Sequence, residues 1–306
     1  MTDRGRAAPE SAAGDSPAQP AGDLAPGVMT EYVTGDWGTF IRSRALLERF
    51  RSPYQEVEVH DSVPFGKLFR LDGHFMTSEA DEFYYHENLV HVPGLAHPGP
   101  ERALVIGGGD GGSTEELLKY PSMKSVTVAE IDAAVVDVAR RHLAAVHRGA
   151  FDDPRVTLHI GDGFGFVAGD TGSYDLIVLD LTDPGGPSTA LYTPRFYQAC
   201  ARRLTPSGAL SMHVGSPVSH GARVRSALDD LRAAFPRVTP YLASIPLYGG
   251  LWMMACAAPS LDPREHSATA VDARIAERGI AALQYVNGET YRAALALPNF
   301  VRDLLA

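Results

Sequence analysis

The string ALVIGGGDGGSTEELL at residues 103–118 constrains the fold more than any other part of the chain. A short apolar run ends in glycines and continues into a stretch of helix-forming residues. The run is too short for a buried helix, so it is expected to be a strand. Gly107, Gly109 and Gly112 have the G-x-G-x-x-G spacing. The string therefore predicts a strand–loop–helix unit whose loop approaches a nucleotide or nucleoside.

Apolar runs and amphipathic stretches alternate from this point onward. Further strands are expected at residues 125–130, 155–160, 174–180 and 209–214, with helices between them and two more strands after residue 234. Such alternation is typical of a parallel sheet covered by helices on both faces. The predicted fold class is α/β with a doubly wound, Rossmann-like sheet, whose ligands bind at the carboxyl ends of the strands.

A different pattern precedes this sheet. Residues 54–60 alternate partly between apolar and polar, and Asp72-Gly73 is typical of a hairpin turn because Gly adopts positive φ readily. Residues 81–92 then switch to helical spacing, with apolar residues suited to one buried face. A small N-terminal domain of β-strands is therefore expected before the larger one.

The first residues belong to neither pattern. They are rich in Ala, Pro and Gly, and no apolar segment follows Arg4 and Arg6, so a disordered tail is expected rather than a signal peptide. Met29 is an alternative start of the chain. The expected division is a tail at 1–28, an N-terminal β-strand domain at 29–80 and a Rossmann-like catalytic domain at 81–306.

Composition excludes several classes of function. The chain has 27 Lys and Arg against 37 Asp and Glu, a net charge of −10, which disfavours a nucleic-acid binder. Its two cysteines, Cys200 and Cys256, cannot form a disulfide framework and fit the reduced cytoplasm. No apolar run approaches the roughly 20 residues that span a bilayer. We expect a cytoplasmic protein that acts on small molecules.

Asp110, inside the glycine loop, distinguishes between ligands. In a dinucleotide enzyme this loop faces a pyrophosphate, which a carboxylate would repel. The same carboxylate suits a ligand that carries positive charge. An S-adenosyl sulfonium compound has adenine, ribose and a positive charge but no phosphate, so it is favoured over NAD.

Four more acids follow predicted strands. Glu130 ends the strand after the glycine loop, where an acid commonly binds ribose hydroxyls, and Asp162, Asp180 and Asp183 follow or end later strands. Clustered carboxylates repel one another unless cations neutralise them, so a cationic ligand is expected. A metal is not expected, because the histidines of HENLVH (86–91) are spaced one residue too far apart to share a helical face.

Several strings, taken in order, resemble the polyamine aminopropyltransferases, the spermidine synthase family. They are YQEVEV, FGKLFRLDG, SEADEFYYHE, GGGDGG, AEID, GDGFGF, DLTDPGGP and IPLYGG. The resemblance extends from about residue 30 to the C-terminus. It implies a sheet of the S-adenosylmethionine methyltransferase type, and transfer of an aminopropyl group from decarboxylated S-adenosylmethionine to an amine, releasing methylthioadenosine. The sulfonium compound is then a co-substrate, no further cofactor is expected, and a homodimer or homotetramer is implied.

The resemblance also assigns roles to residues on the amine side. It implies that Asp180 is the proton acceptor, that Asp183 helps to hold the amine, and that Asp110 binds the aminopropyl ammonium or the polyamine. The residues implied to line the amine channel are Tyr85, His86 and Tyr248.

On the co-substrate side, the resemblance places Glu130 on the ribose and Asp162 and Gly163 at the adenine. Gln55 and Pro187 would contact the methylthioadenosine part. The glycines of the loop implied to approach the same ligand are Gly107 and Gly109.

The chemistry of the residues agrees with this assignment. A primary amine is mostly protonated at pH 7, and an ammonium has no lone pair with which to attack carbon. A carboxylate must therefore accept a proton, the role implied for Asp180. Asp183, three residues away, is expected to raise the pKa of one of the pair and so make it a better base.

The acceptor amine is left open by two departures from the putrescine-using members. Leu181-Thr182 separates Asp180 from Asp183, and Leu247 stands in IPLYGG where those enzymes often have Thr. Putrescine, giving spermidine, is expected; spermidine, cadaverine or agmatine are alternatives. An S-adenosylmethionine methyltransferase is a further alternative, disfavoured because the extra carboxylate of that ligand would be repelled near Asp110. Because Asp180 and Asp183 are both present, a non-catalytic adenosyl-binding protein is also disfavoured.

Overall fold

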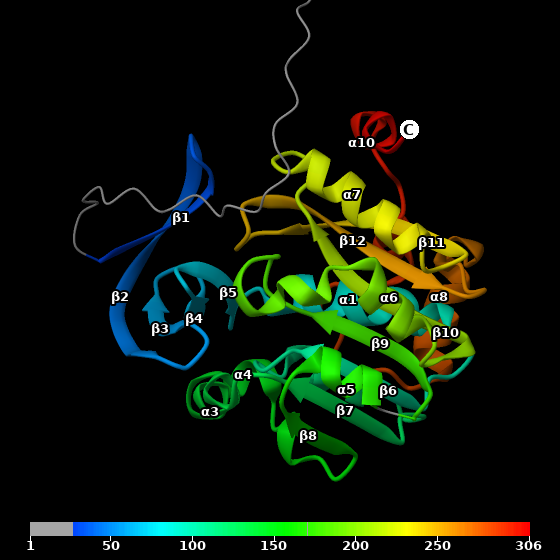
Figure 1. Ribbon diagram of the computed structural model, residues 1–306, viewed down its shortest axis with the longest axis horizontal. Helices are drawn as coiled ribbons and strands as arrows, with labels where there is room; N and C mark the ends of the chain where they lie inside the picture. The colour runs from blue at the N-terminus through cyan, green and yellow to red at the C-terminus, as the bar shows by residue number, and fades with distance from the viewer. Residues whose placement is uncertain (1–26, 170) are drawn as a thin grey trace, which may run out of the picture.

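Two sheets organise the chain in the computed structural model, which describes residues 27–169 and 171–306. The predicted tail at 1–28 lies almost wholly outside these residues. The first sheet is antiparallel, with its strands in sequence order, and lies beside the larger sheet (Figure 1). Its strands are β1 (Val28–Thr34), β2 (Trp37–Arg51), β3 (Glu56–Ser62), β4 (Gly66–Leu71) and β5 (His74–Ser78).

The predicted hairpin turn is confirmed. Asp72 and Gly73 alone join β4 to β5, and both have positive φ, 47° and 84°. Two successive residues in this conformation form the turn whose twist matches that of paired antiparallel strands.

The second sheet has seven strands in the order β11-β12-β10-β9-β6-β7-β8. The strands are β6 (Arg102–Gly107), β7 (Ser125–Glu130), β8 (Val156–Ile160), β9 (Tyr174–Asp180), β10 (Leu204–Gly215), β11 (Arg237–Ile245) and β12 (Gly250–Ala258). The doubly wound, Rossmann-like class is confirmed, because the chain starts at the central β6 and builds outward in both directions.

The expectation of a wholly parallel sheet is wrong at one strand. Pairs from β8 to β10 are parallel, but β12 is antiparallel to both β10 and β11. Only residues 246–249 connect β11 to β12. A connection of four residues allows a hairpin but not the crossover that a parallel pair requires.

Helices cover both faces of this sheet (Figure 1). They are α1 (Glu82–Ala96), α2 (Gly112–Leu118), α3 (Ala133–His142), α4 (Ala144–His147), α5 (Gly163–Gly169), α6 (Pro194–Ala201), α7 (Gly221–Arg232), α8 (Ala268–Glu277), α9 (Gly288–Ala294) and α10 (Asn299–Leu305). Three 3₁₀ turns are η1 (Ala150–Asp152), η2 (Gly186–Leu191) and η3 (Pro263–Glu265). None of the helices in the described ranges is both long and apolar enough to cross a membrane.

The central strands are apolar throughout because both of their faces are buried. Val105 packs with residues of α1 and α2 on one face, and its neighbour Ile106 packs with residues of α5 to α7 on the other. A third cluster joins the two sheets, since Val57 and Phe69 of the small sheet pack against Val136 of α3. The N-terminal sheet is thereby held next to the carboxyl ends of the central strands.

Helix α1 is buried on more sides than the spacing of its apolar residues predicts. The expected single apolar face is present, but Glu87 on another face is fully buried as well. Its carboxylate accepts backbone N–H groups from Gln284 (2.6 Å), Tyr285 (3.0 Å) and Val286 (2.7 Å). Glu87 therefore fixes the segment before α9 against α1.

Replacement of this carboxylate tests that role. Glu87→Gln keeps the size of the side chain but turns an amide NH₂ toward buried N–H groups, and is expected to lower the free energy of unfolding by about 2–3 kcal/mol. Urea-induced unfolding followed by circular dichroism measures the change. Glu277→Gln, an exposed position at the end of α8, is the matched control. Equal unfolding midpoints for both variants would contradict the role of Glu87.

Candidate active site

A cavity of about 130 Å³ lies at the carboxyl ends of β6, β7 and β9. Residues from both sheets line it, including Phe69 and Met76 of the N-terminal sheet. The structure brings together at this cavity nearly all of the site residues expected from the sequence. They are Gln55, Tyr85, His86, Gly107, Gly109, Asp110, Glu130, Asp162, Gly163, Asp180, Pro187 and Tyr248.

The glycine loop fits closely between β9 and α1. Gly107 has a φ of +78°, and a Cβ there would overlap the carbonyl oxygen of Asp180. At Gly112, a Cβ would overlap the ring of His86. Glycine at these positions lets the loop place Asp110 beside the end of β9 and next to α1.

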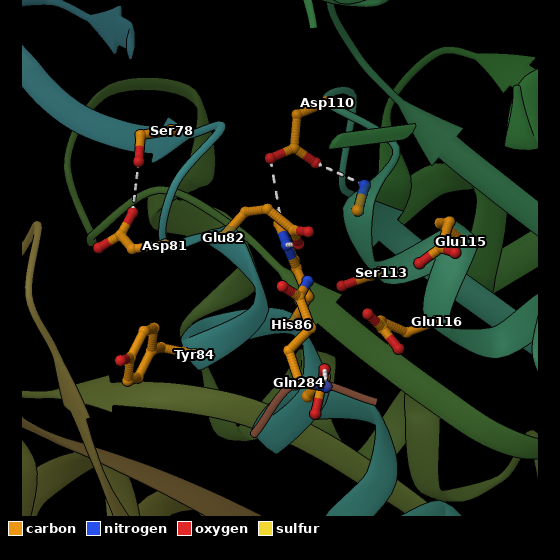
Figure 2. A network of polar contacts seen from close by, with 12 residues as sticks. Ser78, Asp81, Glu82, Tyr84, His86, Asp110, Ser113, Glu115, Glu116 and Gln284 are labelled. Atoms are coloured by element: carbon orange, nitrogen blue, oxygen red, sulfur yellow. Dashed lines mark hydrogen bonds and ion pairs between the residues drawn. The ribbon is translucent and has the colours of Figure 1, made fainter. Parts of the chain in front are cut away.

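His86 lies close to three carboxylates, of which Figure 2 shows those of Glu82 and Asp110. Its Nδ1 is 2.8 Å from Glu82 Oε2, and its Nε2 is 3.4 Å from Asp110 Oδ2 and 3.9 Å from Asp180 Oδ2. Burial alone would lower the pKa of His86, but Asp110 and Glu82 outweigh it and raise this pKa well above its usual value. The ring is therefore an imidazolium at neutral pH, with its Nδ1–H directed at Glu82 and its Nε2–H facing Asp110.

The pKa values of the two aspartates shift in opposite directions. Burial tends to raise the pKa of Asp110, but His86 outweighs this effect and lowers that pKa. Burial and then the charge of Asp110 raise the pKa of Asp180 to about 6, although Ser113 Oγ donates a hydrogen bond to its Oδ2 (2.7 Å). The carboxylate that raises the pKa of Asp180 is thus Asp110, rather than Asp183 as expected from the sequence.

Asp183 is the one expected site residue that does not line the cavity. Its Oδ2 lies 2.9 Å from Nη2 of Arg223 on α7, and its Oδ1 lies 3.7 Å from Nδ1 of His213 on β10. The sequence analysis did not single out Arg223 or His213. They are 40 and 30 residues away, and neither lies in a recognisable motif.

Two further acids at the cavity are held by backbone groups. Glu130 Oε1 accepts the N–H of Asp132 (2.8 Å), and burial raises the pKa of Glu130 to about 7. Asp162 Oδ2 accepts the N–H of Gly165 (2.8 Å) at the start of α5. Both side chains are therefore fixed at the edge of the cavity.

Asp132 connects the two sheets at this edge. Its Oδ2 accepts hydrogen bonds from Gln55 Nε2 (3.1 Å) and from Ser52 Oγ (2.6 Å), both just before β3. Asp132 lies within AEID, but no role is predicted for it from the sequence. Its position two residues after Glu130 was the available signal.

His86, Asp110 and Asp180 each present a possible metal ligand, with the three atoms within 4.8 Å of one another. His91, which the sequence places too far from His86 to share a metal with it, contacts Glu116 Oε2 at 2.8 Å. In its imidazolium form His86 has no free lone pair, so a metal ion at this cluster would have to displace a proton from the ring.

Two family descriptions match the chain. Residues 29–79 match the spermidine synthase tetramerisation domain, and residues 82–263 match the spermine/spermidine synthase domain. A polyamine aminopropyltransferase of Nitrosomonas europaea is 48% identical over 291 residues, which cover 95% of this chain and 88% of the relative. One of Moorella thermoacetica is 38% identical over 278 residues, covering 90% and 95%.

Solved structures agree with these matches. A spermidine synthase in complex with the transition-state analogue AdoDATO has a TM-score of 0.86 and 35% identity, covering 91% of this chain and 94% of the other. The spermidine synthase of Thermotoga maritima has a TM-score of 0.84, with the same identity and coverage. The chain therefore belongs to the spermine/spermidine synthase family and is an aminopropyltransferase.

Proposed function

We propose that this aminopropyltransferase transfers the aminopropyl group of decarboxylated S-adenosylmethionine to putrescine, giving spermidine and methylthioadenosine, with Asp180 as the general base. The observation that carries the proposal is Asp180, whose side chain is only 11% exposed and has a pKa of about 6, beside Asp110 and its His86 partner. The relative solved with AdoDATO supports the same class of reaction.

The nucleoside half of the co-substrate would occupy the side of the cavity formed by β6 to β8. Glu130 would accept hydrogen bonds from the ribose hydroxyls. Asp162 and Gly163 would contact the adenine, and Gln55 and Pro187 the methylthioadenosine part. The glycine loop at Gly107 and Gly109 leaves room for the ligand to approach the backbone. No further cofactor enters the proposed reaction.

Proton transfer comes before or during attack. The acceptor ammonium gives one proton to Asp180, which frees a lone pair on nitrogen. That nitrogen attacks the carbon next to the sulfonium, a C–N bond forms, and the C–S bond breaks with its electron pair going to sulfur. Asp110, held by His86, would bind the ammonium of the aminopropyl group. Tyr85 and Tyr248, with ring centroids 5.9 Å apart, would enclose the methylenes of the acceptor.

Assembly is proposed to occur through the N-terminal sheet. The match of residues 29–79 to a tetramerisation domain supports a homodimer or homotetramer, and β2 exposes the large apolar side chains Phe40, Leu46 and Leu47. Light scattering in solution measures the mass, and a monomer would contradict this proposal. A cytoplasmic location is part of the same proposal.

Incubation with decarboxylated S-adenosylmethionine and an amine panel tests the function. We expect methylthioadenosine and spermidine by mass spectrometry with putrescine, and Asp180→Asn to lower kcat by about 10²–10⁴-fold because no base remains. Methylthioadenosine affinity should change less than about threefold, since Asp180 lies on the amine side.

The control is Asp137→Asn, at an exposed position on α3. If product forms only with spermidine, cadaverine or agmatine, that amine and not putrescine is the acceptor. Absence of methylthioadenosine with every amine would contradict aminopropyl transfer, and equal loss of turnover and binding in Asp180→Asn would indicate a structural role.

The raised pKa of Asp180 makes the base sensitive to pH. Since the protonated carboxyl cannot accept a proton, turnover is expected to fall as the pH decreases through about 6. Carboxyl ¹³C NMR of the ligand-free protein, with Asp180 assigned by the signal lost in Asp180→Asn, measures the midpoint directly. A midpoint near 4, the value of an ordinary aspartate, would contradict the proposed environment.

Glu130 makes nucleoside binding sensitive to pH as well. Ribose hydroxyls donate to the ionised carboxylate, so binding lowers its pKa from about 7 and releases a proton. Methylthioadenosine affinity is expected to fall up to about tenfold per pH unit below 7. Calorimetry in buffers of different ionisation enthalpy measures the released proton, and Glu130→Gln should abolish the release. A proton count of zero in the unmodified protein would contradict the role of Glu130.

A further inference from the structure

One oxygen of the Asp180 carboxylate is surrounded by groups of the protein. Oδ2 accepts a hydrogen bond from Ser113 Oγ (2.7 Å) and lies 3.9 Å from His86 Nε2. A Cβ on Gly108 would lie 3.2 Å from the same oxygen. These groups belong to α2, α1 and the glycine loop, so Oδ2 is turned toward these three elements.

The backbone of Asp180 is fixed as well. Its carbonyl oxygen accepts the N–H of Gly108 (2.9 Å), and its strand β9 is paired with β6 on one side and β10 on the other. The freedom that remains to the carboxylate is rotation about its side-chain bonds. The hydrogen bond from Ser113 restricts this rotation, because turning the carboxylate would lengthen or bend the bond.

Ser113 is itself held in place. It is the second residue of α2, and its side chain is fully buried. A Ser hydroxyl near the start of a helix often bonds to backbone groups close by, but this one donates to Asp180, 67 residues away in the chain. Helix α2 is fixed to α1 in turn, since Glu116 Oε2 lies 2.8 Å from His91 Nε2 and both side chains are fully buried. The donor therefore has a fixed position beside the acid.

The next residue of α2 has no such bond. Thr114 is fully buried too, but its Oγ1 has no hydrogen-bond partner among the residues that the structure describes. Burial on this helix therefore does not by itself require a partner for a hydroxyl. Thr114 is a matched control for Ser113, because the two hydroxyls differ in their contact with Asp180.

We propose that Ser113 is a positioning residue of the aminopropyl transfer, whose hydroxyl holds the Asp180 carboxylate by Oδ2 in the orientation that accepts the proton of the amine. Asp180 lines the cavity, whereas Ser113 is fully buried and is not among the lining residues. Ser113 therefore acts through Asp180 and not on the substrate. This inference rests on the proposed function, because it takes Asp180 as the base.

Ser113→Ala is expected to lower kcat about tenfold, because the base is less well oriented toward the amine. Turnover is measured at about pH 9, roughly three units above the pKa of Asp180, so that the carboxyl is ionised in every variant and the change reports orientation. The KM of the amine and the affinity for methylthioadenosine should change less than about threefold. Thr114→Val, which removes the neighbouring hydroxyl at constant size, should keep the original kcat.

A second measurement detects the hydrogen bond itself. Burial and then Asp110 raise the pKa of Asp180, and the bond from Ser113 is among the contacts that lower it. Carboxyl ¹³C NMR should therefore give an Asp180 midpoint about one pH unit higher in Ser113→Ala than in the unmodified protein. The midpoint should not move in Thr114→Val. A contact that served only stability would leave this midpoint unchanged.

Combination with Asp180→Asn shows whether Ser113 acts through the base. Ser113→Ala should cause no further loss of kcat in that background, since no base remains to be oriented. The same tenfold loss there, an unmoved midpoint or an unchanged kcat in Ser113→Ala alone, or an equal loss in Thr114→Val would each overturn the proposal. The midpoint is measured without turnover, so it is separate from the proposed function, which fails if the unmodified enzyme releases no methylthioadenosine with any amine.

Discussion

The site depends on one buried cation, the imidazolium of His86, held between Glu82 and Asp110. Three carboxylates could not remain ionised so close together without it, since each would raise the pKa of the others. The ring has little freedom, because α1 is buried, Glu82 is one turn before it and Gly112 leaves space for it. The position of this ring therefore decides which acid stays charged and which acid can act as a base.

Both sheets are needed to complete the cavity. The larger sheet supplies the acids at its strand ends, and the smaller sheet supplies a wall and, through Asp132, the placement of Gln55. The packing of β3 and β4 against α3 fixes the position of the smaller sheet relative to the larger one. A change in the N-terminal sheet can thus alter the part of the cavity near Gln55 without touching Asp180.

The sequence predicted the central strands and the acids at their ends, because buried parallel strands are apolar throughout and their carboxyl ends meet at one edge. It did not predict the direction of β12, which depends on a four-residue connection, or the burial of Glu87, whose partners lie almost 200 residues away. The pairing of Asp183 with Arg223 was not predicted either, because its two residues are 40 positions apart in the chain. Spacing within a motif reveals local neighbours, whereas α7 brings its arginine from a distant part of the chain.

Asp180 and Asp183 show how surroundings give the same side chain different chemistry. Asp180 ends a strand in a buried position beside another carboxylate, so its proton affinity rises toward that required of a base near neutral pH. Asp183 lies in the following loop, partly exposed and next to a guanidinium, so it stays ionised and is a poor base. Asp180 thus combines near-complete burial with a neighbouring carboxylate, whereas Asp183 is balanced by a guanidinium, so the proposed proton transfer fits Asp180 and not Asp183.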